Sequence, residues 1–61
     1  MRKVPFGELK IGTRFFDIND GLEYVKMTWT TASQIYYGKV KEFRGSGCVY
    51  VKGTINIINR P

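Results

Sequence analysis

The sequence predicts an all-β domain in the form of a small antiparallel barrel or a strongly bent sheet. Short runs of β-branched and aromatic residues recur along the chain, and turn signals separate them at intervals of about 8–12 residues. The 61 residues are 43% hydrophobic and 15% aromatic, which suffices for one small packed core. A single flat sheet would leave too many of these aromatic side chains in water, so we expect the sheet to curl.

The first twelve residues are expected to hold an edge segment and one helical turn. Residues 1–4 have the character of a tail or edge strand, and Pro5 disfavours a helix at the residue before it. In residues 6–12, a single helical turn or a tight loop would place Phe6 and Leu9 on the core.

Residues 13–18 and 22–29 form the first predicted hairpin. Both runs are rich in β-branched and aromatic residues, and Asn19-Asp20-Gly21 between them is a strong turn signal. Trp29, at the end of the second run, is expected in the core.

The register of this hairpin depends on the length of its turn. A three-residue loop would set Asp17 opposite Glu23 and bring two like charges together. We therefore favour a two-residue turn at Asp20-Gly21, which sets Phe16 opposite Val25.

Three further strands are predicted after the polar residues 30–33. They occupy residues 34–43, 48–52 and 54–58, separated by a turn at 44–47 and by a bend at Gly53. Five short strands with a one-turn connector fit an SH3-like barrel. An oligonucleotide/oligosaccharide-binding barrel usually needs a longer chain and an inserted helix. Residues 1–61 are expected to form one domain.

Strict alternation over residues 34–43 would mix hydrophobic and charged side chains on one face. A β-bulge at Gly38 would shift the phase by one residue and separate them. The residues that would then face the core are Ile35, Tyr37 and Val40. Folding this strand back on residues 48–52 would set Lys41 opposite Tyr50, and Lys39 opposite Lys52.

The outward side chains of that arrangement form one strip in which aromatic rings alternate with cations. Its members are Tyr36, Lys39, Lys41, Phe43, Arg44, Tyr50 and Lys52. Rings offer stacking surfaces to bases and lysines meet phosphates, so the strip predicts binding to nucleic acid, with single strands preferred. The alternative interpretation is structural: the tyrosines cover sheet edges, and the lysines keep those edges soluble and unpaired.

Positive charge is concentrated in the second half of the chain. Residues 1–30 hold five basic and four acidic side chains, whereas residues 31–61 hold five basic and one acidic. The formal net charge of +5 favours encounter with polyanions or with acidic protein surfaces.

No set of side chains has the composition of a catalytic centre. The chain has no histidine, and its one cysteine, Cys48, lacks a base to activate it. Asp17, Asp20 and Glu23 cluster at the first hairpin but match no calcium-loop spacing. We therefore expect a non-enzymatic protein with no cofactor and no metal.

The residues that carry a family resemblance are Phe6, Leu9, Gly12 and Phe15 or Phe16, followed by Glu23-Tyr24-Val25-Lys26. Over about the first 26 residues, the chain resembles small uncharacterised bacteriophage and bacterial proteins with a Phe-Leu-Gly-Phe spacing and a Tyr-Val-Lys strand. The resemblance implies the cytoplasm of a bacterial or phage-infected cell and no assigned activity. Small phage proteins often act on host factors, so the alternative function is an effector or inhibitor that binds a host protein.

Composition also bears on location and assembly. The chain has no run of about 18 apolar residues, and no basic start followed by an apolar segment, so neither a membrane span nor a signal peptide is expected. A single cysteine fits a reduced, cytoplasmic setting. An exposed strand edge in so small a barrel could pair with its copy, so a homo-oligomer is a further expectation to test.

Overall fold

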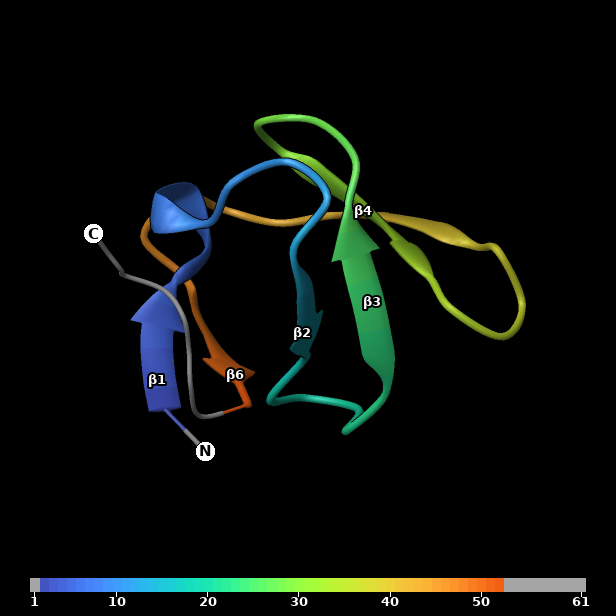
Figure 1. Cartoon of the computed structure of the whole chain (residues 1–61), viewed down its shortest axis with the longest axis horizontal. Helices are drawn as coiled ribbons and strands as arrows, with labels where there is room; N and C mark the ends of the chain where they lie inside the picture. The colour runs from blue at the N-terminus through green and yellow to red at the C-terminus, as the bar shows by residue number, and fades with distance from the viewer. Residues whose placement is uncertain (1, 53–61) are drawn as a thin grey trace.

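The computed structural model describes residues 2–52, which form one antiparallel sheet of six strands. In chain order the elements are β1 (Arg2–Pro5), the 3-10 turn η1 (Phe6–Glu8), β2 (Arg14–Phe16), β3 (Glu23–Lys26), β4 (Thr31–Gln34), β5 (Val40–Glu42) and β6 (Cys48–Val51). Across the sheet the order is β1-β6-β2-β3-β4-β5 (Figure 1). The predicted all-β fold with one helical turn near the N-terminus is confirmed. No helix in the described part of the chain is long and apolar enough to cross a membrane.

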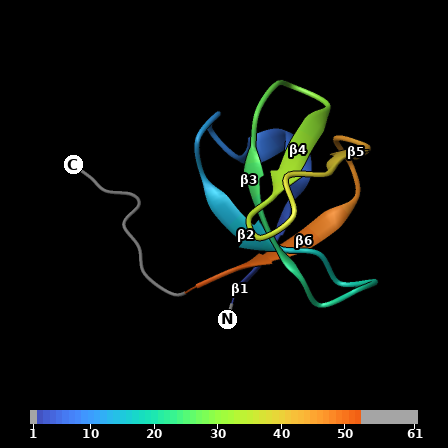
Figure 2. The same ribbon diagram turned by 90° about the vertical axis from the view of Figure 1, so that its right-hand side faces the viewer.

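The sheet curls round its core but does not close into a complete barrel (Figure 2). Its edges are β1 and β5, and within residues 2–52 these two strands do not pair with each other. The loop between β5 and β6 bridges the gap. The N–H groups of Phe6 and Gly7 donate to the carbonyls of Gly47 and Gly45, at 2.8 and 2.9 Å. Of the two forms expected, the chain therefore adopts the strongly bent sheet.

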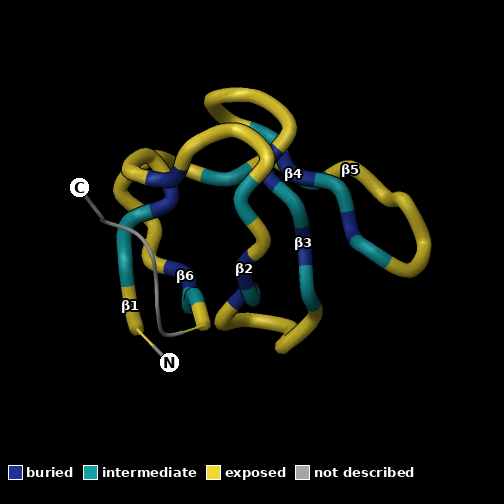
Figure 3. Tube along the Cα trace, in the orientation of Figure 1, coloured by how far each residue is buried: buried dark blue, intermediate teal, exposed yellow. Residues whose placement is uncertain are grey.

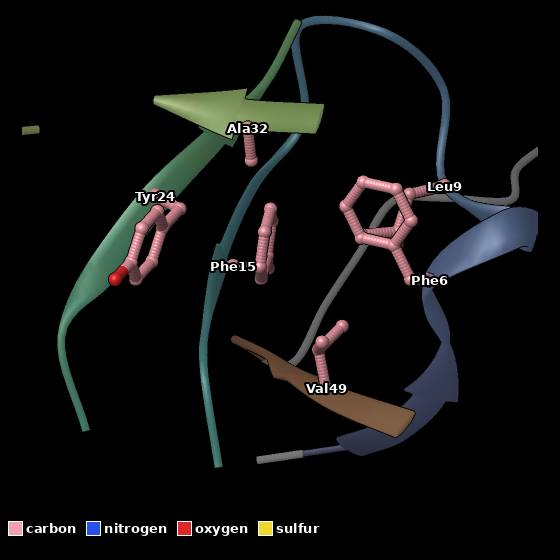
Figure 4. Packing of buried hydrophobic residues seen from close by; sticks show 6 residues of the cluster. All are labelled: Phe6, Leu9, Phe15, Tyr24, Ala32 and Val49. Atoms are coloured by element: carbon pink, nitrogen blue, oxygen red, sulfur yellow. The ribbon is translucent and has the colours of Figure 1, made fainter. Parts of the chain in front are cut away.

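Four aromatic rings form the centre of the core. Phe6 and Phe15 meet edge to face with ring centroids 5.5 Å apart. Phe43, from the loop after β5, stacks on Phe6 at 4.8 Å and lies 5.2 Å from Phe15. Figure 4 shows Phe15 between Phe6 and Tyr24, and Tyr24 stacks on Phe15 at 5.8 Å. The remaining buried hydrophobic residues are Leu9, Ala32 and Val49. The predicted placement of Phe6 and Leu9 on the core is confirmed.

The adjacent strands β3 and β4 bury every second residue, as expected for a sheet with one face on a core. In β3 the buried residues are Tyr24 and Lys26, and in β4 they are Ala32 and Gln34. The turns between strands are mostly exposed (Figure 3). One of the inward positions is thus occupied by a lysine.

Lys26 has no exposed surface and makes its polar contacts with backbone carbonyls. Its Nζ donates to the carbonyls of Phe6 and Leu9, at 3.0 and 2.8 Å, and lies 4.4 Å from the centre of the Phe6 ring. Among the described residues it forms no ion pair with a carboxylate. Burial lowers the pKa of the Lys26 amine, because the charged form loses its water. Lys26 therefore ties β3 to the helical turn.

The prediction of one strand over residues 34–43 is wrong. The chain turns at residues 35–37, and Gly38, with φ of +70°, belongs to this turn and forms no β-bulge. The N–H of Gly38 donates to the carbonyl of Gln34 at 2.8 Å. Glycine adopts positive φ without a Cβ clash, so the same residue suits a turn as well as a bulge. Residues 31–33, expected as a polar break, lie in β4.

The favoured register of the first hairpin is also wrong. Phe16 lies opposite Glu23, and Phe15 lies opposite Tyr24. The connection is longer than two residues, because the N–H of Asp17 donates to the carbonyl of Leu22 at 3.0 Å. In this register Glu23 lies opposite Phe16 and Asp17 is buried, so the two carboxylates do not form the like-charge pair.

The predicted pairing of residues 34–43 with residues 48–52 is absent from the described sheet. β6 pairs with β1 and β2, whereas β5 pairs with β4. Trp29 was expected in the core but is 71% exposed, since it follows β3 in the turn to β4. The strand predicted at residues 54–58 lies outside the described residues.

Replacing Gly7 by Ala should destabilise the fold by about 1–3 kcal/mol. A Cβ at Gly7 would lie 3.1 Å from the carbonyl oxygen of Gly45 and 3.2 Å from its Cα. The matched control is Gly45→Ala, whose Cβ would meet only the Gly7 Cα, at 3.8 Å. Both changes stiffen the unfolded chain similarly, so the difference between them reports the clash. Equal urea midpoints for the two variants would contradict the close approach.

Replacing Lys26 by Met should alter how stability depends on pH. The folded state holds the Lys26 proton less tightly than the unfolded chain, whose lysine pKa is about 10.5. The full cost of the charged amine therefore applies at every pH below the folded-state pKa, and it is relieved as the pH rises from there towards 10.5. Wild-type stability relative to Lys26→Met should rise as the pH increases towards 10.5. Urea denaturation of both proteins at several pH values measures this difference, and a constant difference would refute the prediction.

Candidate nucleic-acid interface

The structure does not bring the predicted strip together on one surface. β5 lies beside β4 with Lys41 opposite Ala32, and this pairing directs Lys41 towards the core face. Phe43 is half-buried and belongs to the aromatic core. Lys41 and Phe43 therefore face inwards, contrary to the expected outward orientation.

Three other members of the strip lie away from β6. Tyr36 and Lys39 are exposed in the turn between β4 and β5, which projects at the end of the molecule opposite β1 (Figure 1). Arg44 is exposed in the loop after β5 and lines an open hollow with Thr30 and Glu42. The expected pairing of Lys39 with Lys52 is wrong for the same reason.

Tyr50 and Lys52 occupy a different surface, the outer face of β6. Val49 is buried in the core, so alternation directs its neighbour Tyr50 outwards. On one side Tyr50 lies opposite Lys3 of β1, and on the other it lies opposite Phe16 of β2. Two half-buried aromatic residues thus form a cross-strand pair on the outside of the sheet.

Exposed cations flank this aromatic pair on two sides. Lys3 lies across the ladder from Tyr50, Lys52 lies two residues beyond it, and Arg14 lies two residues before Phe16. Residues two apart on a strand share a face, so Arg14 lies on the outer side with Phe16. Lys52 follows the last residue of β6 and continues the alternation of Tyr50. We name this surface the basic aromatic face: Lys3, Arg14, Phe16, Tyr50 and Lys52.

The charges of this face are available to an external anion. Within residues 2–52, the ion pairs all involve Lys41, and Lys3, Arg14 and Lys52 take part in none. Glu23 of β3 lies opposite Phe16 and marks an acidic border on that side. The face therefore extends over β1, β6 and β2 and ends at β3.

Lys41 forms an internal contact between β5 and the loop that joins β2 to β3. Its Nζ donates to the Asp17 carboxylate and lies 3.6 Å from Oδ2 of Asp20. The hydrogen bond with Asp17 raises the pKa of Lys41 and outweighs the opposing effect of burial. Asp17 is itself buried and also accepts the N–H of Asn19 at 3.1 Å. This cluster fastens β5 to the loop between β2 and β3.

Asp20 and Tyr24 complete the same cluster. The Tyr24 hydroxyl donates to Oδ2 of Asp20 at 2.7 Å. Burial acts to raise the pKa of Asp20, but bonds from Tyr24 and the Leu22 N–H, with the Lys41 charge, lower it overall. Burial, followed by the bond to Asp20, raises the pKa of Tyr24. No group of three metal-ligating side chains occurs in the part of the chain that the structure describes.

No family model matches this sequence, and no curated protein or solved structure matches it either.

Three members of the basic aromatic face were missed in the sequence: Lys3, Arg14 and Phe16. The alternation in Arg14-Phe15-Phe16 gave a usable signal, because burying Phe15 turns both neighbours outwards. The pairing of β6 with β1 and β2 had no such local signal. Cys48 is exposed at the start of β6 and is not a core residue.

Asp17 and Lys41 should be energetically coupled. In a double-mutant cycle of Asp17→Asn and Lys41→Met, we expect a coupling free energy of about 1 kcal/mol, reduced by the partial exposure of Lys41. A cycle with Asp20→Asn in place of Asp17→Asn is the control. It should give a smaller coupling, because the separation is 3.6 Å and Asp20 is more exposed. Additive effects of the Asp17 and Lys41 changes on urea unfolding would contradict the ion pair.

Proposed function

We propose that this domain is a non-enzymatic module that binds nucleic acid, with single strands preferred, through the basic aromatic face. The observation that carries the proposal is the pairing of Phe16 with Tyr50 on the outside of the sheet, among three cations that form no ion pair within residues 2–52. Aromatic side chains on sheet surfaces stack bases in several RNA-binding domains, and nearby cations meet phosphates.

The distribution of charge supports a polyanionic partner. The net charge is +5, yet Lys26 is buried and Lys41 is paired with Asp17. The charge that an approaching ligand meets therefore comes from the remaining basic side chains, which include all three cations of the basic aromatic face. Such a field accelerates encounter with a polyanion.

Single strands suit this face better than a duplex. Stacking on Phe16 and Tyr50 requires bases whose flat faces are accessible, and the bases of a duplex are stacked on one another. A duplex could meet the cations through its phosphates but would leave the rings without partners. We therefore expect duplex DNA to bind more weakly than a single strand of the same length.

The salt dependence of binding should reflect the three cations of the basic aromatic face. For a labelled single-stranded oligonucleotide, fluorescence anisotropy should give a log–log salt slope of about −2, since each neutralised phosphate contributes about −0.7. Lys52→Gln should weaken binding and reduce the slope by about 0.7. The matched control is Lys39→Gln, which removes the same charge from the β4–β5 turn and should have a smaller effect.

Two results would count against this proposal. The absence of binding to single strands at low salt would reject nucleic acid and favour the host-protein alternative. Equal weakening by Lys39→Gln and Lys52→Gln would show binding by overall charge and would reject the basic aromatic face as the site.

A further inference from the structure

We infer that the basic aromatic face binds two neighbouring unpaired bases, one on Phe16 and one on Tyr50, with phosphates held by Lys3, Arg14 and Lys52. This inference rests on the proposed function and specifies its ligand. It specifies how many bases stack on the face and over which strands of the sheet the nucleic-acid backbone runs.

The spacing of the Phe16 and Tyr50 side chains across the sheet bears on how the bases are arranged. Phe16 and Tyr50 are directly opposite across antiparallel strands. Such residues have Cβ atoms about 4.5–5.5 Å apart. At their Cβ atoms the two side chains are thus farther apart than the roughly 3.4 Å rise between stacked bases in a DNA strand. A single strand opened beyond duplex geometry can therefore place one base on each ring.

The cations lie on two sides of the ring pair. Lys3 flanks Tyr50 across the ladder, whereas Arg14 and Lys52 both lie at one end of the pair, two residues along their antiparallel strands and about 7 Å away. Phosphates beside the base on Tyr50, and phosphates at that end of the pair, would thus meet a cation. The footprint is short, at the low end of the roughly 4–16 nucleotides that single-strand-binding domains cover.

Glu23 limits the path of the bound nucleic acid on one side of the face. It lies opposite Phe16 on β3 and is half-buried at the border of the face. A carboxylate there repels phosphate, so the backbone should run over β1, β6 and β2. Glu23→Gln should strengthen binding about two- to fivefold at low salt, by removing one unfavourable charge.

An abasic oligonucleotide separates base stacking from phosphate binding. We would measure anisotropy of an oligothymidylate and of an abasic oligomer with the same number of phosphates, both with the wild-type protein. Stacking predicts tighter binding of the oligothymidylate, by about tenfold or more. Equal affinity would overturn the inference but leave nucleic-acid binding through phosphates intact. No binding of either oligomer would overturn both.

Leucine variants assign the stacking to particular rings. Phe16→Leu and Tyr50→Leu should each reduce the preference for bases over abasic sites about fivefold or more, with binding of the abasic oligomer unchanged. Tyr36→Leu, in the exposed β4–β5 turn, removes a ring at a distance and should leave the preference unchanged. A preference lost in Tyr36→Leu and kept in the other two would overturn the assignment.

Discussion

The packing of Phe43 against Phe6 is the contact on which the rest of the structure depends. The sheet is open between β1 and β5, so its ladder alone does not enclose a core. Phe43 leaves β5 and stacks on Phe6 of the helical turn at 4.8 Å, joining the two ends of the sheet through side chains. The backbone bonds from Phe6 and Gly7 to the loop after β5 then align the same two segments.

This packing explains why two lysine side chains point towards the core of a domain of this size, one buried and one partly exposed. Once the sheet curls, alternation directs Lys26 and Lys41 towards the concave side. Each is satisfied differently: Lys26 donates to two carbonyls near the helical turn, and Lys41 pairs with Asp17. Buried polar groups that find partners add specificity to a small core, because an alternative packing would leave them unpaired.

The same curl creates the outer surface. Burial of Phe15 and Val49 on the concave side turns Phe16 and Tyr50 outwards on adjacent strands. The core and the basic aromatic face are thus the two opposite faces of the same strands. A change of register by one residue in β2 or β6 would exchange the inward and outward side chains of that strand. It would place Phe16 or Tyr50 in the core together with a neighbouring cation.

The sequence by itself determined the features that depend on neighbouring residues. Alternation and turn residues were enough to predict an all-β chain, and the spacing of Phe6 and Leu9 was enough to predict a helical turn that rests on the core. The outward orientation of Tyr50 was also predicted, since alternation along a strand is local. These inferences need no knowledge of which strands become neighbours.

Only the tertiary structure decided the pairing of β6 with β1 and β2, and with it the composition of the face. A period of two directs side chains to one side or the other but does not specify the neighbouring strand. The sequence pattern also did not predict the turn at Gly38, because a glycine with positive φ fits a turn and a bulge equally well. Strand neighbours were set by long-range hydrogen bonds and by aromatic packing around Phe43. Both kinds of contact join residues that are far apart in the sequence, so a local pattern does not predict them.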